Sequence, residues 1–179
     1  MIRKWELLIR EAKLLPTLNT VVEIGTMRLP LTDPLCEGYG MSTLKFGEYV
    51  TSLKGEYHSV DIDEDAINNA RSICGDLPIS FHNVDGQKFL STWDEDKKID
   101  LLYLDALSPA VTFALYSKGR KLLSPGGIIV LDDCHTDEDG TFSKGSLVIP
   151  HAMREALDLS FYGAYDNSIM VVIRGLNDN

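Results

Sequence analysis

The chain has 179 residues, which suits one domain with a substantial buried core. Its 27 acidic and 17 basic residues give a net charge of −10 without a basic cluster, which argues against nucleic acid and anionic membranes as partners. Three separated cysteines argue against a disulfide framework or a zinc site, and the absence of a signal peptide or long apolar run predicts a cytoplasmic protein.

The first half of the chain alternates amphipathic helices with short apolar strands. Apolar residues recur at helical spacing from Ile2 to Ala12, and Pro16 ends this segment. Prolines and glycines then indicate a long loop insertion, after which Ser42 is expected to cap a helix. The predicted elements are a helix at 1–16, a strand at 20–24, a loop at 26–39, a helix at 43–54, a strand at 57–62 and a helix at 64–74.

The second half continues this alternation and ends differently. Its predicted elements are strands at 78–83, 99–104 and 128–131, helices at 87–93, 109–123 and 147–158, a turn at 124–127, a loop at 132–145, and final strands at 160–165 and 168–174. Asp166-Asn167 joins the final strands as a hairpin. We therefore expect a single doubly wound α/β domain over 1–179. Its seven-stranded sheet is mostly parallel and has a C-terminal antiparallel hairpin.

Acidic residues stand at the ends of five successive predicted strands. In an open parallel sheet, ligands bind outside the carboxyl ends of the strands. Each acid alone could be an ordinary solvated loop residue, but the series together favours a ligand site. The residues are Glu23 with Gly25, Asp61 with Asp63, Asp85 with Gly86, Asp105, and Asp132 with Asp133.

Asp61 closes the second strand, 21 residues after Gly40, where a carboxylate can accept hydrogen bonds from a ribose diol. A helix N-cap is the alternative, although Asp63 suits that role better. The segment 38–43 has two glycines that allow a ligand close to the backbone, and it leads into a helix N-terminus that attracts an anion. That anion is a phosphate or an amino-acid carboxylate. The segment lacks the third glycine of a dinucleotide fingerprint, and a plain tight turn is its other interpretation.

Five stretches, in order and across residues 20–174, resemble the motifs of class I S-adenosylmethionine-dependent methyltransferases. They are 22–26 with 38–43, then 59–63, 83–86, 99–105 and 122–133. The resemblance implies the Rossmann-like methyltransferase fold, whose sheet also ends in an antiparallel hairpin. It implies S-adenosylmethionine as cofactor, with the methionine portion near Gly25, Gly40 and Ser42, the ribose on Asp61, and the adenine near Asp85 and Gly86. The complete set of cofactor-binding candidates is Glu23, Gly25, Thr26, Gly40, Ser42, Asp61, Ile62, Asp85, Gly86 and Asp105.

Asp105 and the pair Asp132-Asp133 resemble the ligands of the metal-dependent O-methyltransferases, of both the catechol and the antibiotic-sugar types. In those enzymes an acid after the fourth strand and an acid pair after the fifth hold one Mg²⁺. Three oxygen ligands leave room for water and substrate hydroxyls, and the ion lowers the pKa of a bound hydroxyl. The alternative is that the pair only ends a strand and caps a turn.

The catalytic candidates are Asp105 and His135. Catechol-type enzymes place a lysine three residues after the first metal acid, where this chain has Ser108. His135 could supply the general base instead, because an unperturbed imidazole titrates near about pH 6.5. A loop histidine without a role is the alternative, and Lys144 and His151 are weaker candidates.

These observations predict methyl transfer to a hydroxyl of a small hydroxylated acceptor, assisted by a divalent cation. Two alternatives stay open: a nicotinamide-dependent oxidoreductase, and a non-catalytic cofactor-binding module, which the missing lysine keeps open. The sequence leaves the oligomeric state undetermined, with a homodimer as one arrangement. The 26–39 insertion is expected to cover the cofactor or to border the acceptor.

Overall fold

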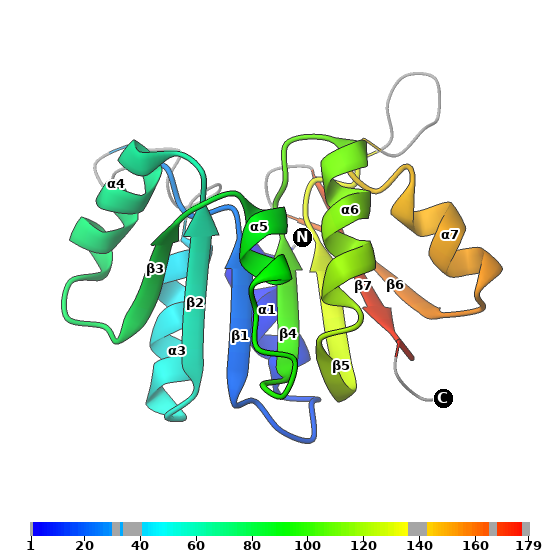
Figure 1. The fold of residues 1–179 in the computed structure, drawn as a ribbon, viewed down its shortest axis with the longest axis horizontal. Coiled ribbons are helices and arrows are strands. Elements are labelled where there is room, and N and C mark those ends of the chain that lie inside the picture. Colours follow the sequence, from blue (N-terminus) through cyan, green and yellow to red (C-terminus); the bar gives the residue numbers. More distant parts are fainter. Residues whose placement is uncertain (1, 30–32, 34–40, 136–142, 165–167, 177–179) are drawn as a thin grey trace.

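The computed structural model describes residues 2–29, 33, 41–135, 143–164 and 168–176. Its described strands form one sheet in the order β3-β2-β1-β4-β5-β7-β6 (Figure 1). Their bounds are β1 (Thr20–Ile24), β2 (Glu56–Asp61), β3 (Ile79–Asn83), β4 (Ile99–Leu104), β5 (Leu123–Leu131), β6 (Asp158–Gly163) and β7 (Ile169–Arg174). Strands β1 to β5 pair in parallel, while β7 is antiparallel to β5 and β6. The predicted fold class is confirmed, and the single-domain boundary at 1–179 stays a prediction.

Helices cover both faces of this sheet (Figure 1). One face packs against α5 (Gly86–Ser91), α6 (Pro109–Gly119) and α7 (Val148–Arg154). The opposite face packs against α1 (Lys4–Ala12), the π-helix η1 (Ser42–Phe46), α3 (Gly47–Ser52) and α4 (Glu64–Cys74). Among the described helices, none is both long enough and apolar enough to cross a membrane.

The central strands β1 and β4 are mostly apolar because both of their faces are buried. In β4, Leu101 packs on the side of α1 and α3, and Leu102 packs on the side of α5 and α6. Every residue of β4 is buried, including Asp100, whose carboxylate accepts hydrogen bonds from the backbone N–H groups of Asn19 and Thr20. This burial explains why the run was recognisable as the centre of a parallel sheet.

Several predicted boundaries are wrong. Ser42 does not cap a helix: it begins η1, and its hydroxyl donates to a Glu23 carboxylate oxygen at 2.9 Å. The expected turn at 124–127 lies within β5, where the pairing with β4 shifts register and Gly126 takes a φ of +76°. Helix α6 ends at Gly119 rather than near 123, because Leu123 already pairs with Ile99 of β4.

Two loop predictions fall partly outside the described residues. Of the 26–39 insertion, the structure describes 26–29 and 33, and of the loop at 132–145 it describes 132–135 and 143–145. The expected role of the insertion therefore stays a prediction. The chain leaves β1 toward β2 and leaves β4 toward β5, on opposite sides, so a crevice is expected where β1 and β4 end.

Candidate active site

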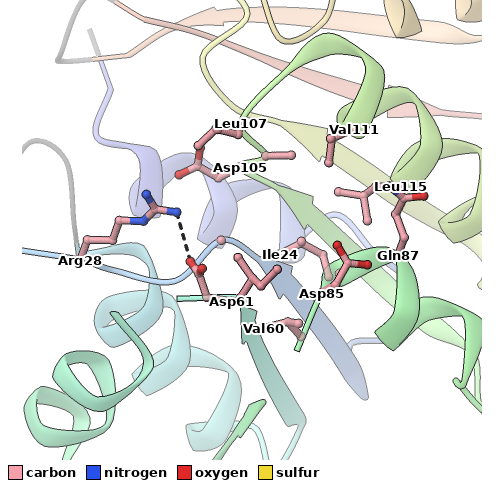
Figure 2. Close-up of a pocket in the computed structure, with 14 residues that line it drawn as sticks. Ile24, Arg28, Val60, Asp61, Asp85, Gln87, Asp105, Leu107, Val111 and Leu115 are labelled. Atoms are coloured by element: carbon pink, nitrogen blue, oxygen red, sulfur yellow. Dashed lines mark hydrogen bonds and ion pairs between the residues drawn. The ribbon is translucent and has the colours of Figure 1, made fainter. Parts of the chain in front are cut away.

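A cavity of about 220 Å³ lies at the carboxyl ends of β1, β2 and β4 (Figure 2). Its position is the point where the sheet connections run in opposite directions, as expected for a ligand site in this type of sheet. Six of the predicted cofactor-binding residues line it: Gly25, Asp61, Ile62, Asp85, Gly86 and Asp105. The other lining residues are Ile24, Arg28, Val60, Gln87, Ala106, Leu107, Val111 and Leu115.

Gly25 shapes the floor of the cavity because only glycine suits its position. Its φ is +99°, and its N–H donates to the carbonyl oxygen of Val60 at 2.8 Å. A Cβ atom here would lie 2.5 Å from the carbonyl oxygen of Asp105. Because that oxygen belongs to the backbone, it cannot easily move away to relieve the clash. Glycine at this turn thus lets the ends of β1 and β4 approach each other.

Asp61 is buried, and three donors hold its carboxylate. One oxygen accepts from the backbone N–H of Asp63 at 2.9 Å, and the other from the N–H of Thr26 at 3.1 Å. The guanidinium of Arg28 contacts the second oxygen at 3.4 Å (Figure 2). Asp63 caps α4 as predicted, accepting from the N–H groups of Asp65 and Ala66, so Asp61 is available for the cavity.

Sequence reasoning missed Arg28. The available signal was a basic residue three positions after the strand-end glycine, but residues 26–39 were interpreted together as an insertion. The structure instead places Arg28 in the wall of the cavity.

Three predicted cofactor ligands lie beside the cavity rather than in its lining. Glu23 is fully buried and accepts hydrogen bonds from the hydroxyls of Ser42, Thr43 and Ser59 at 2.9, 2.7 and 2.8 Å. Burial raises the pKa of Glu23 to about 7. The Thr26 hydroxyl lies 2.8 Å from the Ser59 hydroxyl, within hydrogen-bond distance, and joins this layer. Glu23, Thr26 and Ser42 therefore fix the start of η1 to β1 and β2, and Gly40 lies outside the described residues.

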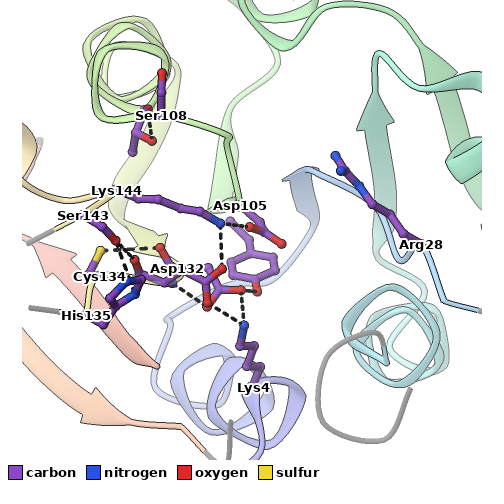
Figure 3. Close-up of polar contacts among 12 residues, drawn as sticks. Lys4, Arg28, Asp105, Ser108, Asp132, Cys134, His135, Ser143 and Lys144 are labelled. Atoms are coloured by element: carbon purple, nitrogen blue, oxygen red, sulfur yellow. Dashed lines mark hydrogen bonds and ion pairs between the residues drawn. The ribbon is translucent and has the colours of Figure 1, made fainter. Parts of the chain in front are cut away.

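The predicted carboxylate cluster forms as expected. One carboxylate oxygen from each of Asp105, Asp132 and Asp133 lies within 4.8 Å of the others. Two lysines contact the cluster (Figure 3). The Lys4 ammonium, from α1, lies 2.9 Å from both Asp132 and Asp133. The Lys144 ammonium contacts Asp105 and lies 2.8 Å from Asp133.

The pKa values of the two acids in the pair shift in opposite directions, upward for Asp132 and downward for Asp133. Burial raises the pKa of Asp132 to about 7, and the negative charge of Asp105 adds to this effect. The Tyr103 hydroxyl donates to Asp132 at 2.6 Å. Burial also acts to raise the pKa of Asp133, but the positive charges of Lys4 and Lys144 lower it to about 2. The charge of the cluster is thus partly compensated by side chains of this chain.

The cluster fits a divalent cation in its donor chemistry. Three converging carboxylates provide the hard oxygen ligands that Mg²⁺ and Ca²⁺ prefer. The two ammonium groups would compete with such an ion for the same oxygens. Burial acts to lower the pKa of Lys144, but contact with Asp105 and Asp133 raises it overall, so in this arrangement Lys144 is an ammonium and not a base.

The histidine candidates do not line the cavity. His135 is exposed, its Nδ1 lies 3.3 Å from the Ser143 hydroxyl, and it lies on the side of Asp132 away from Asp105 (Figure 3). His151 belongs to α7 and pairs with Glu155 at 3.3 Å. Ser108, at the position of the expected lysine, caps α6 by accepting from the N–H of Val111.

A family model described as a methyltransferase domain matches residues 37–134, more than half of the chain. The matched segment runs from the chain before η1 to the carboxylate pair after β5. The chain belongs to the class I S-adenosylmethionine-dependent methyltransferases. No curated protein shows significant sequence similarity to this methyltransferase.

Solved structures share the fold of this methyltransferase at low sequence identity. Cofactor-bound Rv0187 from MTB is 16% identical with a TM-score of 0.70, over 96% of this chain and 78% of that chain. The O-methyltransferase TomG from Streptomyces achromogenes is 17% identical with a TM-score of 0.68, over 96% and 78%. The N-methyltransferase NodS from Bradyrhizobium japonicum is 16% identical with a TM-score of 0.64, over 96% and 93%. At these identities the likeness establishes the fold.

Proposed function

We propose that this methyltransferase transfers the methyl group of S-adenosylmethionine to a hydroxyl of a small molecule, with help from Mg²⁺ or another divalent cation. The main support is the double position of Asp105. This residue lines the cavity and is also one of the three clustered carboxylates. A cation held by the cluster would therefore lie beside the bound cofactor.

The lining residues suit the parts of S-adenosylmethionine. Asp61 would accept hydrogen bonds from the ribose hydroxyls, since its carboxylate is already oriented by backbone N–H groups. Asp85 and Gly86 would border the adenine, together with the apolar side chains of Ile62, Val111 and Leu115 that also line the cavity. The TomG structure contains S-adenosylmethionine, which agrees with this assignment of the cofactor.

The acceptor atom is the finer part of the proposal. A bound divalent cation would lower the pKa of an acceptor hydroxyl and orient it. Asp105, Asp132 and Asp133 would hold the ion, while Lys4 and Lys144 neutralise these carboxylates when no ion is bound. Relatives of this fold include an O-methyltransferase and an N-methyltransferase, so hydroxyl specificity rests on the carboxylate cluster rather than on the fold.

Turnover with isotopically labelled S-adenosylmethionine would test the proposal. The acceptor panel contains catechols, sugars and hydroxylated natural products, each with its amine analogue, in Mg²⁺ or in excess EDTA. We expect transfer to hydroxyls in Mg²⁺, loss in EDTA and recovery on adding Mg²⁺. Asp132→Asn should reduce turnover more than it reduces binding of S-adenosylhomocysteine.

Each part of the proposal can fail separately. Full methyl transfer in excess EDTA would contradict the role of the cation, while the methyltransferase activity itself would still be supported. Transfer to amines alone would remove the hydroxyl acceptor. Cofactor binding without any turnover would favour the non-catalytic module. His135 as general base, the small acceptor without nucleic acid or membrane partners, a homodimer and a cytoplasmic location stay predictions.

A further inference from the structure

Arg28 is the one basic residue among the described residues that line the cavity. It stands at one end, Asp85 and Gln87 stand at the other, and Asp61 lies between them (Figure 2). The side chain of Arg28 is 52% exposed and touches Asp61 at 3.4 Å. An ion pair this long and this exposed is weak, so a better anionic partner could replace Asp61.

Hydrogen bonds hold the backbone around Arg28, so the position from which its side chain extends is fixed. The N–H of Thr26 donates to Asp61, and the N–H of Met27 donates to the Thr43 hydroxyl at 3.0 Å. The carbonyl oxygen of Arg28 itself accepts from the side-chain amide of Asn69, in α4, at 3.0 Å. Only the guanidinium end therefore needs to move when its partner changes.

The cofactor's own chemistry supplies that partner. S-adenosylmethionine has its adenine at one end, a ribose in the middle and an amino acid with a carboxylate at the other end. With the ribose on Asp61 and the adenine near Asp85, the amino-acid end would face Arg28 and Asp105. A guanidinium binds a carboxylate through two parallel hydrogen bonds, which is stronger than a single long contact.

We propose that Arg28 binds the carboxylate of the cofactor's methionine portion and leaves Asp61 as the cofactor enters. This inference rests on the proposed function and adds a specificity residue to it. Both residues gain a cofactor partner in this exchange. Arg28 binds the carboxylate, and its departure frees an Asp61 oxygen for a ribose hydroxyl. Arg28 thus selects complete S-adenosylmethionine or S-adenosylhomocysteine over nucleosides that lack the amino acid.

Calorimetry with two ligands tests this selection. S-adenosylhomocysteine has the amino acid, and 5′-methylthioadenosine has the same nucleoside and a thioether without it. We expect Arg28→Gln to weaken S-adenosylhomocysteine binding at least about tenfold, the effect of one charge-assisted contact. Binding of 5′-methylthioadenosine should stay within about twofold, because its contacts do not include a carboxylate. Arg71→Gln, which removes the same charge from the exposed side of α4, should change neither affinity.

Three results would overturn the inference. Equal losses for both ligands would mean that Arg28 only supports the structure of the site. Unchanged affinity for S-adenosylhomocysteine, together with a raised KM for an acidic acceptor, would assign Arg28 to the acceptor. If the unmodified protein binds S-adenosylhomocysteine no better than 5′-methylthioadenosine, there is no carboxylate site. By contrast, an unmodified protein that binds neither ligand contradicts the proposed function itself, and this inference with it.

Discussion

The carbonyl oxygen of Asp105 lies 2.5 Å from the position that a Cβ atom on Gly25 would occupy. The same glycine has a φ of +99°, which L side chains rarely adopt. The ends of β1 and β4 therefore approach each other only because residue 25 has no side chain, and the cavity forms along this line of contact.

Gly25→Ala should destabilise the protein and abolish cofactor binding. Backbone strain and a clash with main-chain atoms act together, and we expect a loss of about 2 kcal/mol or more in unfolding free energy. Thermal unfolding and calorimetry with S-adenosylhomocysteine measure the two effects. Gly163→Ala is the matched control, since a Cβ atom there meets nothing within 4 Å. A Gly25→Ala protein with normal stability and affinity would show that the strand ends can separate at little cost.

Asp61→Asn should weaken binding of S-adenosylhomocysteine at least about tenfold, because hydrogen bonds from ribose to a charged acceptor are lost. Unlike Arg28→Gln, it should weaken 5′-methylthioadenosine binding to a similar extent, since both ligands contain the ribose. Asp61→Ala should have at least as large an effect. Asp63→Asn is the control, because asparagine also caps a helix and Asp63 does not line the cavity. Retained affinity in Asp61→Asn would remove Asp61 from the site.

Glu23 should make stability depend on pH. Its pKa in the folded protein, about 7, lies above its usual value of 4.5, because burial disfavours the charged form. Protonated Glu23 thus favours folding, and this contribution is complete below pH 4.5 and is lost as pH rises through 7. The unmodified protein should lose up to about 3 kcal/mol over this window relative to Glu23→Gln.

Denaturant unfolding at pH 5, 6, 7 and 8 measures this difference. Glu95→Gln, at an exposed position, should follow the unmodified protein at every pH. Parallel pH profiles for the unmodified protein and Glu23→Gln would mean that Glu23 does not titrate in this range.

Lys144→Gln should strengthen divalent cation binding. Its ammonium contacts Asp105 and lies 2.8 Å from Asp133, so its removal takes away a competing positive charge. We expect Mn²⁺ affinity to rise at least about fivefold, as judged by electron paramagnetic resonance of the free ion. Lys121→Gln, just before β5 and at the opposite end of the sheet, should leave the affinity unchanged. Unchanged or weaker Mn²⁺ binding in Lys144→Gln would argue that the cluster is an ionic contact and not a cation site.

The sequence by itself determined the sheet and the acids at its edge. Predominantly apolar runs such as β4 were recognisable because both faces of the central strands are buried. The convergence of Asp105 with Asp132 and Asp133 also followed, since neighbouring parallel strands end at the same edge. Asp63 was identifiable as a cap because that interaction is local in the chain.

Only the tertiary structure decided which charges meet. Lys4 reaches Asp132 because α1 packs across the sheet, and no local pattern connects residues that far apart in the chain. The contact of Arg28 with Asp61 and the hydrogen bond of Ser42 to Glu23 likewise join separate segments. Periodicity reports which face of a helix or strand is buried. Contacts between polar side chains depend on how those elements pack, and that packing exists only in the folded chain.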